Sequence, residues 1–311
     1  MSKITVLSDL TPDRPTVLTI GKYDGVHIGH QHLLARMRRR AADIGAQTAA
    51  LLLHPNPLAV LRPGTPVIYL ATLEERVALV AEQGIDVVLV HPFTREVAQT
   101  SADDFIAQIR AHLNLVELWE GPNFALGRGR QGTTAYLSDL GSRLGFTVHA
   151  TAPFALLGET VSTSLIRRLV VEGQVEQAAW LLGRPHHLSG EVVHGAKRGR
   201  QLGYPTANLD IPADMAVPAN GIYAVRCQLG DEPLLGVASI GVRPTFDNGP
   251  RSVEVYLLDF DRDIYGQTLK TEFIARLRDE QKFASVEALV EQMGRDVANS
   301  RAALVEPVSL T

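Results

Sequence analysis

The sequence "PTVLTIGKYDGVHIGH", residues 15–30, joins an apolar run to a turn that holds three glycines, one carboxylate and two histidines. The apolar run is typical of a buried strand, and the following "HQHLLARMRRRAADIG" is typical of an amphipathic helix that ends near Gly45. Such a strand-to-helix turn can be a chain reversal that happens to carry histidines, or it can be a site for a phosphate. The turn by itself leaves both interpretations open.

Short apolar runs alternate with amphipathic helices as far as about residue 183. This alternation indicates βαβ units, so we expect residues 1–183 to form an α/β domain with a Rossmann-like parallel sheet. Such sheets bind ligands at the carboxyl ends of their strands, which is where the turn at residues 21–30 lies. The expected strands are 15–21, 48–54, 85–91, 115–121 and 146–151, and the expected helices are 30–45, 72–84, 101–113 and 133–145.

The pattern changes near residue 184, where strand-like segments follow one another and are divided by glycine and proline. Several short strands without intervening helices predict a compact antiparallel β-barrel, and residues 285–304 predict a terminal helix. We therefore expect a second domain at 184–311. Its expected strands are 189–195, 221–230, 234–241, 252–260 and 268–277.

Composition limits the possible functions. The net charge of −4 argues against a general nucleic-acid binder. One cysteine, Cys227, cannot form an internal disulfide, no apolar signal segment begins the sequence, and no apolar run is long enough for a membrane span. We expect a cytoplasmic protein that acts on small molecules, without a nucleic-acid or membrane partner; the oligomeric state stays open.

The two histidines of the turn, His27 and His30, suit an anion. Unpaired N–H groups and the helix dipole attract a phosphate to the start of a helix, and two imidazoles three residues apart can both donate to it. Glycines let the backbone approach closely, while Asp24 suits a turn or a metal more than direct phosphate contact. His-x-x-His could also begin a zinc site, but no third ligand is evident nearby.

A second polar stretch, "GAKRGRQLGYPTANL" at residues 195–209, combines glycines and cations with Pro-Thr-Ala-Asn. Its glycine-rich basic part is typical of a phosphate loop or of a simple surface turn. If the chain stays extended after Pro205, then Thr206 and Asn208 lie on one face. A hydroxyl and an amide oxygen together are hard ligands that suit Mg²⁺.

The turn resembles the His-x-Gly-His signature of nucleotidyltransferases, and it is most similar to the FMN adenylyltransferase module of bacterial bifunctional riboflavin kinase/FAD synthetases. "GPNFALGRGR" (121–130) and "VSTSLIRR" (161–168) resemble two further motifs of that module. The resemblance implies that His27 and His30 stabilise charge on the ATP triphosphate and that Asn123 and Phe124 bind flavin. The implied ATP- and phosphate-binding residues are Gly21, Asp24, Gly25, Gly29, Ser162, Thr163, Ser164 and Arg167.

The chain departs from this module at three places. Asn56, in "LHPNP" (53–57), replaces the usual histidine, and His54 lies earlier. Leu126 stands where phenylalanine is usual, and Thr163–Ser164 reverses the usual order of the two hydroxyl residues.

The second stretch closely resembles the riboflavin kinase signature, and "GVRPTF" (241–246), "VEVYLLDFDRDIYG" (253–266) and "LRDEQKF" (277–283) follow in the order of that family. The resemblance implies that Glu254 is the base that deprotonates riboflavin and that Thr206 and Asn208 hold Mg²⁺. It also implies ATP contacts from Gly195, Lys197, Arg198 and Gly199. Arg243 and Arg278 are candidates for flavin contact, or equally for a salt bridge on the barrel.

The resemblances together imply an enzyme that phosphorylates riboflavin with ATP in its C-terminal domain and adenylylates the FMN product to FAD in its N-terminal domain. Three alternatives stay open. The adenylyltransferase could be weak or retuned beside Asn56, the protein could be a flavin-binding regulator, or the turn alone could belong to a cytidylyltransferase.

Overall fold

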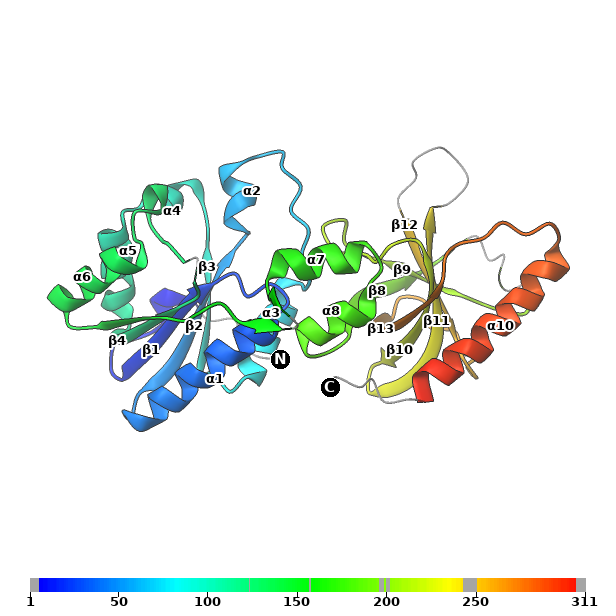
Figure 1. Ribbon diagram of the computed structural model, residues 1–311, viewed down its shortest axis with the longest axis horizontal. Coiled ribbons are helices and arrows are strands. Elements are labelled where there is room, and N and C mark those ends of the chain that lie inside the picture. The colour runs from blue at the N-terminus through cyan, green and yellow to red at the C-terminus, as the bar shows by residue number, and fades with distance from the viewer. Residues whose placement is uncertain are drawn as a thin grey trace. The chain divides into compact units, whose positions relative to one another are not determined.

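The computed structural model describes residues 6–122, 124–156, 158–195, 199, 202–242 and 251–305. The chain divides into two compact units, residues 1–163 and 164–311, and each is described by itself. Figure 1 shows the elements of each unit by label and colour.

The first unit is built on a five-stranded sheet in which every pair of neighbours is parallel. The strand order is β3-β2-β1-β4-β5, so the chain moves outward in one direction from β1 and in the other direction from β4. This reversal creates a switch point at the carboxyl ends of β1 and β4. The strands are β1 (Pro15–Gly21), β2 (Gln47–His54), β3 (Val87–Pro92), β4 (Asn114–Glu120) and β5 (Thr147–Ala150).

Helices cover both faces of this sheet. Alternate strand residues face opposite sides, so Val17 packs with α1 (Ile28–Asp43) and α3 (Leu73–Glu82), whereas Leu18 packs with α5 (Ala102–His112) and α6 (Thr134–Leu144). Side-chain caps begin all four of these helices: an imidazole cap at His27, a capping box at Thr72, and hydroxyl caps at Ser101 and Thr133.

Short elements fill the connections of the first unit. They are η1 (Leu7–Asp9), α2 (Pro57–Leu61), α4 (Arg95–Gln99), η2 (Arg128–Arg130), β6 (Ala155–Leu156) and β7 (Glu159–Thr160). The sequence pattern did not predict them, because two to five residues are too few to display a periodicity.

The second unit contains a closed barrel with the strand order β10-β11-β12-β9-β8-β13. All of its paired strands are antiparallel. The strands are β8 (His186–Val193), β9 (Ala207–Asp210), β10 (Gly221–Leu229), β11 (Glu232–Val242), β12 (Arg251–Leu257) and β13 (Thr268–Arg278).

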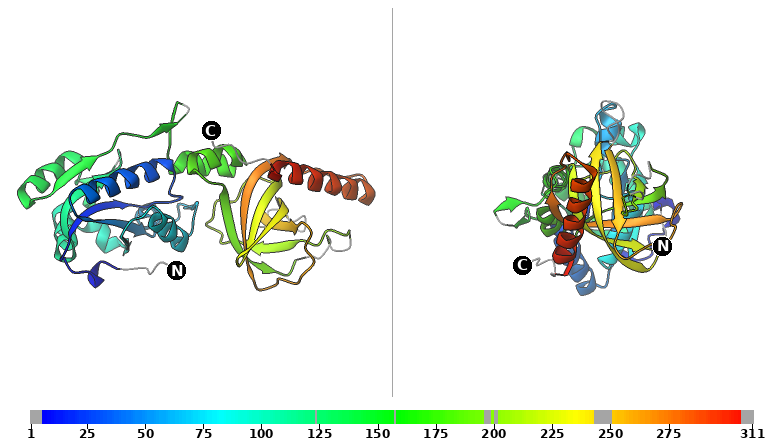
Figure 2. Two further views of the ribbon diagram at one scale, coloured as in Figure 1. Left: turned by 90° about the horizontal axis from the view of Figure 1, so that it is seen from below. Right: turned by 90° about the vertical axis from the view of Figure 1, so that its right-hand side faces the viewer.

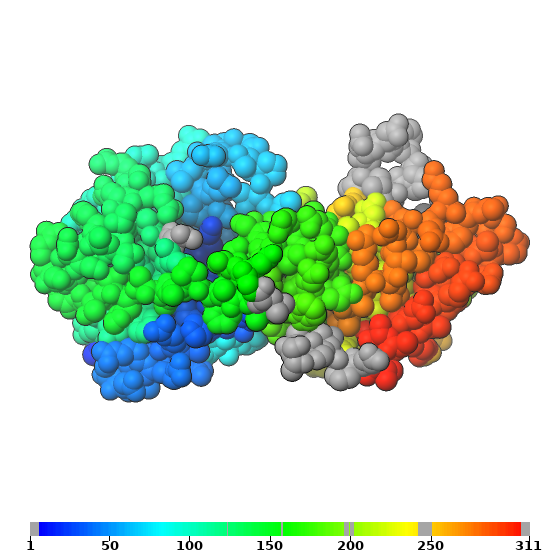
Figure 3. Space-filling view, viewed as in Figure 1, coloured from blue at the N-terminus to red at the C-terminus, as the bar shows by residue number. Residues whose placement is uncertain are grey.

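In the part of the chain that the structure describes, the helices α7 (Thr163–Val171), α8 (Val175–Leu182) and α10 (Val286–Val305) accompany the barrel. The long α10 lies along the outer wall formed by β10, β11 and β13, where Leu304 packs on Ala224 and Ile274 (Figure 2). On another side, α8 packs against β8 and β13, and α7 precedes it. The surface of these two helices is green in Figure 3. The sequence analysis did not predict α8.

The predicted fold class is confirmed, with a parallel sheet in the first half, a closed antiparallel barrel in the second, and a terminal helix. The contact boundary at residues 163/164 places α7 and α8 with the barrel. The expected domain limit at residue 183 concerns functional domains, and it stays a prediction.

A buried ion pair fastens α10 to the barrel. The Arg278 guanidinium donates to both oxygens of Asp296, at 2.8 and 2.6 Å, and the two side chains are only 16% and 5% exposed. Removing one partner of such a pair leaves an uncompensated buried charge.

We therefore expect Asp296→Ala to lower the free energy of unfolding of the second unit by about 3 kcal/mol. Each unit holds one tryptophan, Trp119 or Trp180, so urea unfolding followed by fluorescence in a Trp119→Phe background reports the second unit. Glu291→Ala is the matched control, because its ion pair with Arg295 is exposed and should contribute less than about 1 kcal/mol. Equal losses in the two variants would contradict this prediction.

Candidate active sites

The turn between β1 and α1 has a strained backbone. Three of its residues adopt positive φ: Tyr23 at 49°, Gly25 at 79° and Val26 at 39°. A β-branched residue such as Val26 rarely adopts this conformation, and strain of this kind persists only where surrounding contacts hold it. Here the Tyr23 hydroxyl lies 2.6 Å from the Thr19 hydroxyl on β1, and both side chains are buried.

Asp24 ties the turn to the start of α3. Its buried carboxylate accepts hydrogen bonds from the backbone N–H groups of Leu70, at 2.8 Å, and Ala71, at 3.3 Å. The Thr163 hydroxyl donates to the Asp24 carbonyl oxygen at 3.3 Å, so a second predicted motif meets the turn. These contacts give Asp24 a structural role, and its expected part in phosphate binding stays a prediction.

His27 and His30 stack face to face at the start of α1, with ring centroids 3.7 Å apart. His27 caps the helix, because its Nδ1 accepts the backbone N–H of His30 at 3.3 Å. An accepting Nδ1 carries no hydrogen, so a neutral His27 holds its proton on Nε2.

His30 is kept neutral by its surroundings. Burial, followed by the charges of His27 and Lys22, lowers the pKa of His30 well below its ordinary value. The Nδ1 of His30 is buried and has no hydrogen-bond partner among the described residues. A bound polyphosphate would counter the repulsion from neighbouring cations and favour the charged imidazole.

Two glycines of the turn lie directly against aromatic rings, those of Tyr23 and His27. A Cβ at Gly21 would lie 2.8 Å from the Tyr23 ring, and a Cβ at Gly29 would lie 3.2 Å from the His27 ring. A side chain at Gly21 would force the Tyr23 ring to move, and a side chain at Gly29 would press against the His27 ring.

A buried arginine that the sequence analysis missed supports the end of β2. Arg76 is 1% exposed, and it donates to His54 Nδ1 at 2.9 Å and to the Lys22 carbonyl oxygen at 3.3 Å. Because a guanidinium only donates, His54 Nδ1 is an acceptor. Asn56, which replaces the usual histidine, caps α2 through Leu58 N–H and donates its own N–H to the Tyr69 hydroxyl.

The remaining predicted residues of the first site are only partly assembled within one unit. Phe124 packs against the core on the α5 side of the sheet, and Leu126 is buried in that core. Asn123 lies outside the described residues. Ser162 and Thr163 belong to the first unit, whereas Ser164 and Arg167 belong to the second, and their phosphate role stays a prediction.

Two cavities of the second unit lie beside Thr206, and one of them is lined by the predicted base, Glu254. The loop cavity, of about 340 Å³, is lined by Val192, Gly195, Thr206, Asn208, Val255 and the segment 260–265. The helix cavity, of about 200 Å³, lies between the barrel wall and α10 and is lined by Thr206, Ser239, Glu254, Arg278, Glu280, Leu289 and Met293. Thr206 lines both cavities, so the two spaces meet at this residue.

Glu254 faces the helix cavity from β12. On this strand Val253 and Val255 are buried inside the barrel, so Glu254 points outward. The Thr206 hydroxyl donates to Glu254 Oε2 at 3.2 Å, and the backbone of Glu254 pairs with Asn208. A carboxylate, a hydroxyl and an amide thus meet at the junction of the cavities.

The glycine-rich loop approaches the same junction. A Cβ at Gly195 would lie 2.3 Å from the Asn208 side-chain nitrogen, and a Cβ at Gly199 would lie 2.3 Å from the Tyr204 carbonyl oxygen. Lys197 and Arg198, as well as Arg243, lie outside the described residues. Arg278 lines the helix cavity while it forms the salt bridge with Asp296.

Among the described residues, no group of three or more His, Cys, Asp or Glu side chains is arranged to hold a metal ion. The hard oxygens of Thr206 and Asn208 line the loop cavity beside Glu254, and this donor set suits Mg²⁺.

Comparison with known proteins covers both units. The family model described as FAD synthetase matches residues 10–165, and the model described as riboflavin kinase matches residues 182–304. The bifunctional riboflavin kinase/FMN adenylyltransferase of Pseudomonas fluorescens is 39% identical, over 97% of this chain and 97% of the relative. The chain belongs to the bifunctional riboflavin kinase/FMN adenylyltransferase family.

Further relatives agree in length. The family member of Escherichia coli K12 is 36% identical, over 93% of each chain. A crystal structure described as a macrolide-efflux protein from Streptococcus pneumoniae superposes with a TM-score of 0.88 at 29% identity, over 96% of this chain and 97% of that one. In the described part of the chain, no helix has the length and apolarity needed to cross a membrane.

Glu120, at the carboxyl end of β4, is a second residue that the sequence analysis missed. It is fully buried, the Thr134 hydroxyl donates to its Oε1 at 2.5 Å, and its Oε2 has no partner among the described residues. Burial raises the pKa of Glu120 above the ordinary 4.5, against the opposing effect of the Thr134 hydrogen bond.

The folded chain therefore binds a proton at Glu120 more tightly than the unfolded chain does. The contribution of Glu120 to the free energy of unfolding therefore falls as the pH rises from about 4.5 through the raised pKa of Glu120. Glu120→Gln cannot ionise and should remove this loss, making the variant more stable than the parent at pH 8 by about 1 to 3 kcal/mol.

Urea unfolding from pH 4.5 to pH 8, read from Trp119 fluorescence in a Trp180→Phe background, measures this difference in the first unit. Glu74→Gln, an exposed position in α3, serves as the control. A Glu120→Gln variant whose pH slope matched that of the control would contradict the prediction.

Proposed function

We propose that the loop cavity takes the ATP phosphates and the helix cavity takes riboflavin, so that the 5′-hydroxyl of riboflavin meets the γ-phosphate at Thr206. The observation that carries this proposal is the Thr206–Glu254 hydrogen bond at the junction of the two cavities. Family membership supplies the reaction: riboflavin and ATP give FMN and ADP.

Glu254 acts as the base of this reaction. The riboflavin hydroxyl is neutral, so its proton must leave as its oxygen bonds to the γ-phosphorus and the bond between the γ-phosphorus and the bridging oxygen breaks. The carboxylate of Glu254 accepts that proton, and its contact with Thr206 orients it. Gly195 and Gly199, with Lys197 and Arg198, cover the phosphates.

The oxygens of Thr206 and Asn208 would hold Mg²⁺, which supplies charge neutralisation for the phosphates when it is bound. The chain's own contribution is to present these two oxygens from the start of β9. The tight packing of Gly195 against Asn208 keeps the amide in place.

The first unit adenylylates FMN. An oxygen of the FMN phosphate attacks the α-phosphorus of ATP and pyrophosphate leaves, so the nucleophile is already an anion and no strong base is required. His27 and His30 stabilise the charge on the triphosphate from the start of α1, where the helix dipole also favours an anion. Gly21, Gly25 and Gly29 shape the turn around it.

The other expected ligands complete the first site. Flavin is contacted by Asn123 and Phe124, and Asp24 fixes the turn. The β- and γ-phosphates are held by Ser162, Thr163, Ser164 and Arg167. Arg243 and Arg278 contact flavin in the second site.

We also propose that the protein is soluble in the cytoplasm and has no nucleic-acid or membrane partner. The name macrolide-efflux protein is not carried over, because both halves of the chain match flavin-enzyme models.

The division of labour can be tested with riboflavin, FMN and FAD separated by chromatography after incubation with ATP and Mg²⁺. Glu254→Gln should lower FMN formation at least about a hundredfold, because the base is lost, while FAD formation from supplied FMN persists. His30→Ala should show the reverse pattern. Each variant serves as the folding control of the other.

Equal losses of both activities in a folded Glu254→Gln protein would contradict the assignment of the two sites. If the parent chain forms FMN but no FAD, the adenylyltransferase is weak or retuned, as Asn56 and Leu126 allow. If it forms neither product, the enzymatic proposal fails.

A further inference from the structure

A second carboxylate, Glu280, lines the helix cavity together with Glu254. It follows Arg278 and Asp279 directly after β13, in the "LRDEQKF" motif, and its side chain is exposed at the rim of the cavity. Neither the sequence analysis nor the proposed chemistry gives it a role.

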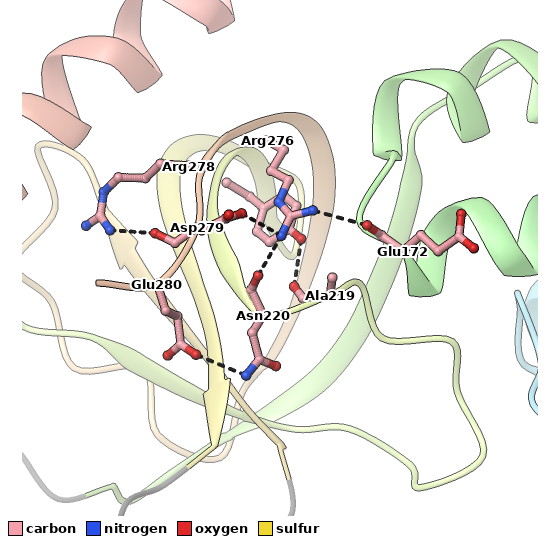
Figure 4. Close-up of polar contacts among 8 residues, drawn as sticks. Glu172, Ala219, Asn220, Arg276, Arg278, Asp279 and Glu280 are labelled. Atoms are coloured by element: carbon pink, nitrogen blue, oxygen red, sulfur yellow. Dashed lines mark hydrogen bonds and ion pairs between the residues drawn. The ribbon is translucent and has the colours of Figure 1, made fainter. Parts of the chain in front are cut away.

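Glu280 is held in place by Asn220. The Asn220 Nδ2 donates to Glu280 Oε2 at 3.0 Å, as Figure 4 shows. Because a carboxylate only accepts, this contact decides which end of the amide faces Glu280. The Asn220 carbonyl oxygen in turn accepts from Arg276 Nη2 at 2.9 Å, which fixes the backbone that presents the amide.

The other carboxylate oxygen packs against the barrel backbone. A Cβ at Gly241, on β11, would lie 2.1 Å from Glu280 Oε1. The Glu280 carboxylate thus occupies the space that a side chain at position 241 would take. Glu280 is therefore located on one side by an amide and on the other by the backbone of β11.

The two arginines near Glu280 form ion pairs with other carboxylates. Arg278 is paired with Asp296, and Arg276 is paired with Asp279 at 2.9 Å. Within the described residues, Glu280 takes part in no ion pair and accepts one hydrogen bond. Its carboxylate thus keeps acceptor capacity at the rim of the cavity.

The pairing of β11 with β12 gives the separation between Glu280 and the predicted base, Glu254, along the strand direction. Ser239 pairs with Glu254 across β11 and β12, and Gly241 lies two residues farther along β11. At about 3.4 Å per residue, Glu280 is roughly 7 Å along the strand from the level of Glu254. It is therefore placed to meet a part of the substrate other than the 5′-hydroxyl.

We propose that Glu280 is a substrate-recognition residue of the kinase site, whose carboxylate accepts a hydrogen bond from riboflavin at a donor other than the transferred hydroxyl. This inference rests on the proposed function. Riboflavin offers two classes of such donors, the imide N–H at N3 of the ring and the 2′-, 3′- and 4′-hydroxyls of the ribityl chain.

The first test compares Glu280→Gln with the parent chain in steady-state formation of FMN. A hydrogen bond to a charged group contributes about 1.5 to 3 kcal/mol, so we expect KM for riboflavin to rise at least about tenfold. The kcat and the KM for ATP should stay within about twofold, because Glu280 touches neither the reacting atoms nor the phosphates. Asp279→Asn is the matched control: it removes the same charge one residue away, from a side chain that is 82% exposed and faces Arg276, and it should leave the KM for riboflavin unchanged.

A second test uses substrate analogues to identify the donor. With 3-methylriboflavin, or with riboflavin lacking one of the three hydroxyls, the parent and Glu280→Gln should differ little for the analogue that lacks the donor, and still differ for the others. A loss of the same size with every analogue would overturn direct recognition and leave Glu280 a structural role.

Gly241→Ala provides an independent test, because the added methyl group must displace the carboxylate. It should raise the KM for riboflavin as Glu280→Gln does, and it should have no further effect on KM in a Glu280→Ala background, where no carboxylate is present. Additive effects of the two changes would overturn the proposal.

The outcomes separate this inference from the proposed function. A parent chain that forms no FMN contradicts the kinase assignment itself. A parent and an Asp279→Asn variant that both form FMN, beside a Glu280→Gln variant with an unchanged KM for riboflavin, overturn the recognition role alone.

Discussion

Close packing of the backbone against polar side chains is the constraint on which the proposed barrel site depends. At Gly195 the chain lies against the Asn208 amide, and at Gly241 it lies against the Glu280 carboxylate, at distances that a Cβ would close. A side chain pinned by backbone loses few rotamers when a ligand arrives, because most of its freedom has already been given up during folding. The glycines thus place polar groups at the two cavities without adding bulk to them.

The proposed function makes different electrostatic demands on the two sites. Adenylylation of FMN uses a nucleophile that is already anionic, and the turn of the first unit offers stacked imidazoles, with the pKa of His30 lowered by burial and by the neighbouring charges of His27 and Lys22. Phosphorylation of riboflavin requires the removal of a proton from a neutral hydroxyl, and the barrel offers the carboxylate of Glu254, which accepts a hydrogen bond from the Thr206 hydroxyl at 3.2 Å. The choice of residues follows from the charge of each nucleophile.

Local features of the fold could be predicted from the sequence, because they depend on periodicity and on capping residues. The βα alternation, five of the six barrel strands and α10 appear in the residue pattern, whereas the four-residue β9 was not among the expected strands. Thr72 and Ser101 cap helices as their types suggest. The short α2 and β6 are too brief to show a period, and α8 went unpredicted although its eight residues are mostly apolar.

In the two sites, contacts between residues far apart in the sequence could not be predicted. His27 and His30 are recognisable from their motif, whereas the link from Asp24 to Leu70 joins residues 46 positions apart. The pairing of Asn220 with Glu280 spans 60 positions. Spacing along the chain carries no trace of such pairs, so the contacts of Arg76, Glu120 and Glu280 are evident only in the folded structure.

The end of β2 shows how such a contact changes the interpretation of a substitution. Asn56 stands where the family usually has histidine, and its side chain is committed to capping α2. The imidazole of this segment is instead His54, and the buried Arg76 holds its Nδ1 as an acceptor while also gripping the Lys22 carbonyl of the turn. One guanidinium therefore joins the β2 edge to the turn that carries His27 and His30. A change at Asn56 alone leaves this connection intact, because the hydrogen bonds of Arg76 to His54 and to Lys22 do not involve the Asn56 side chain.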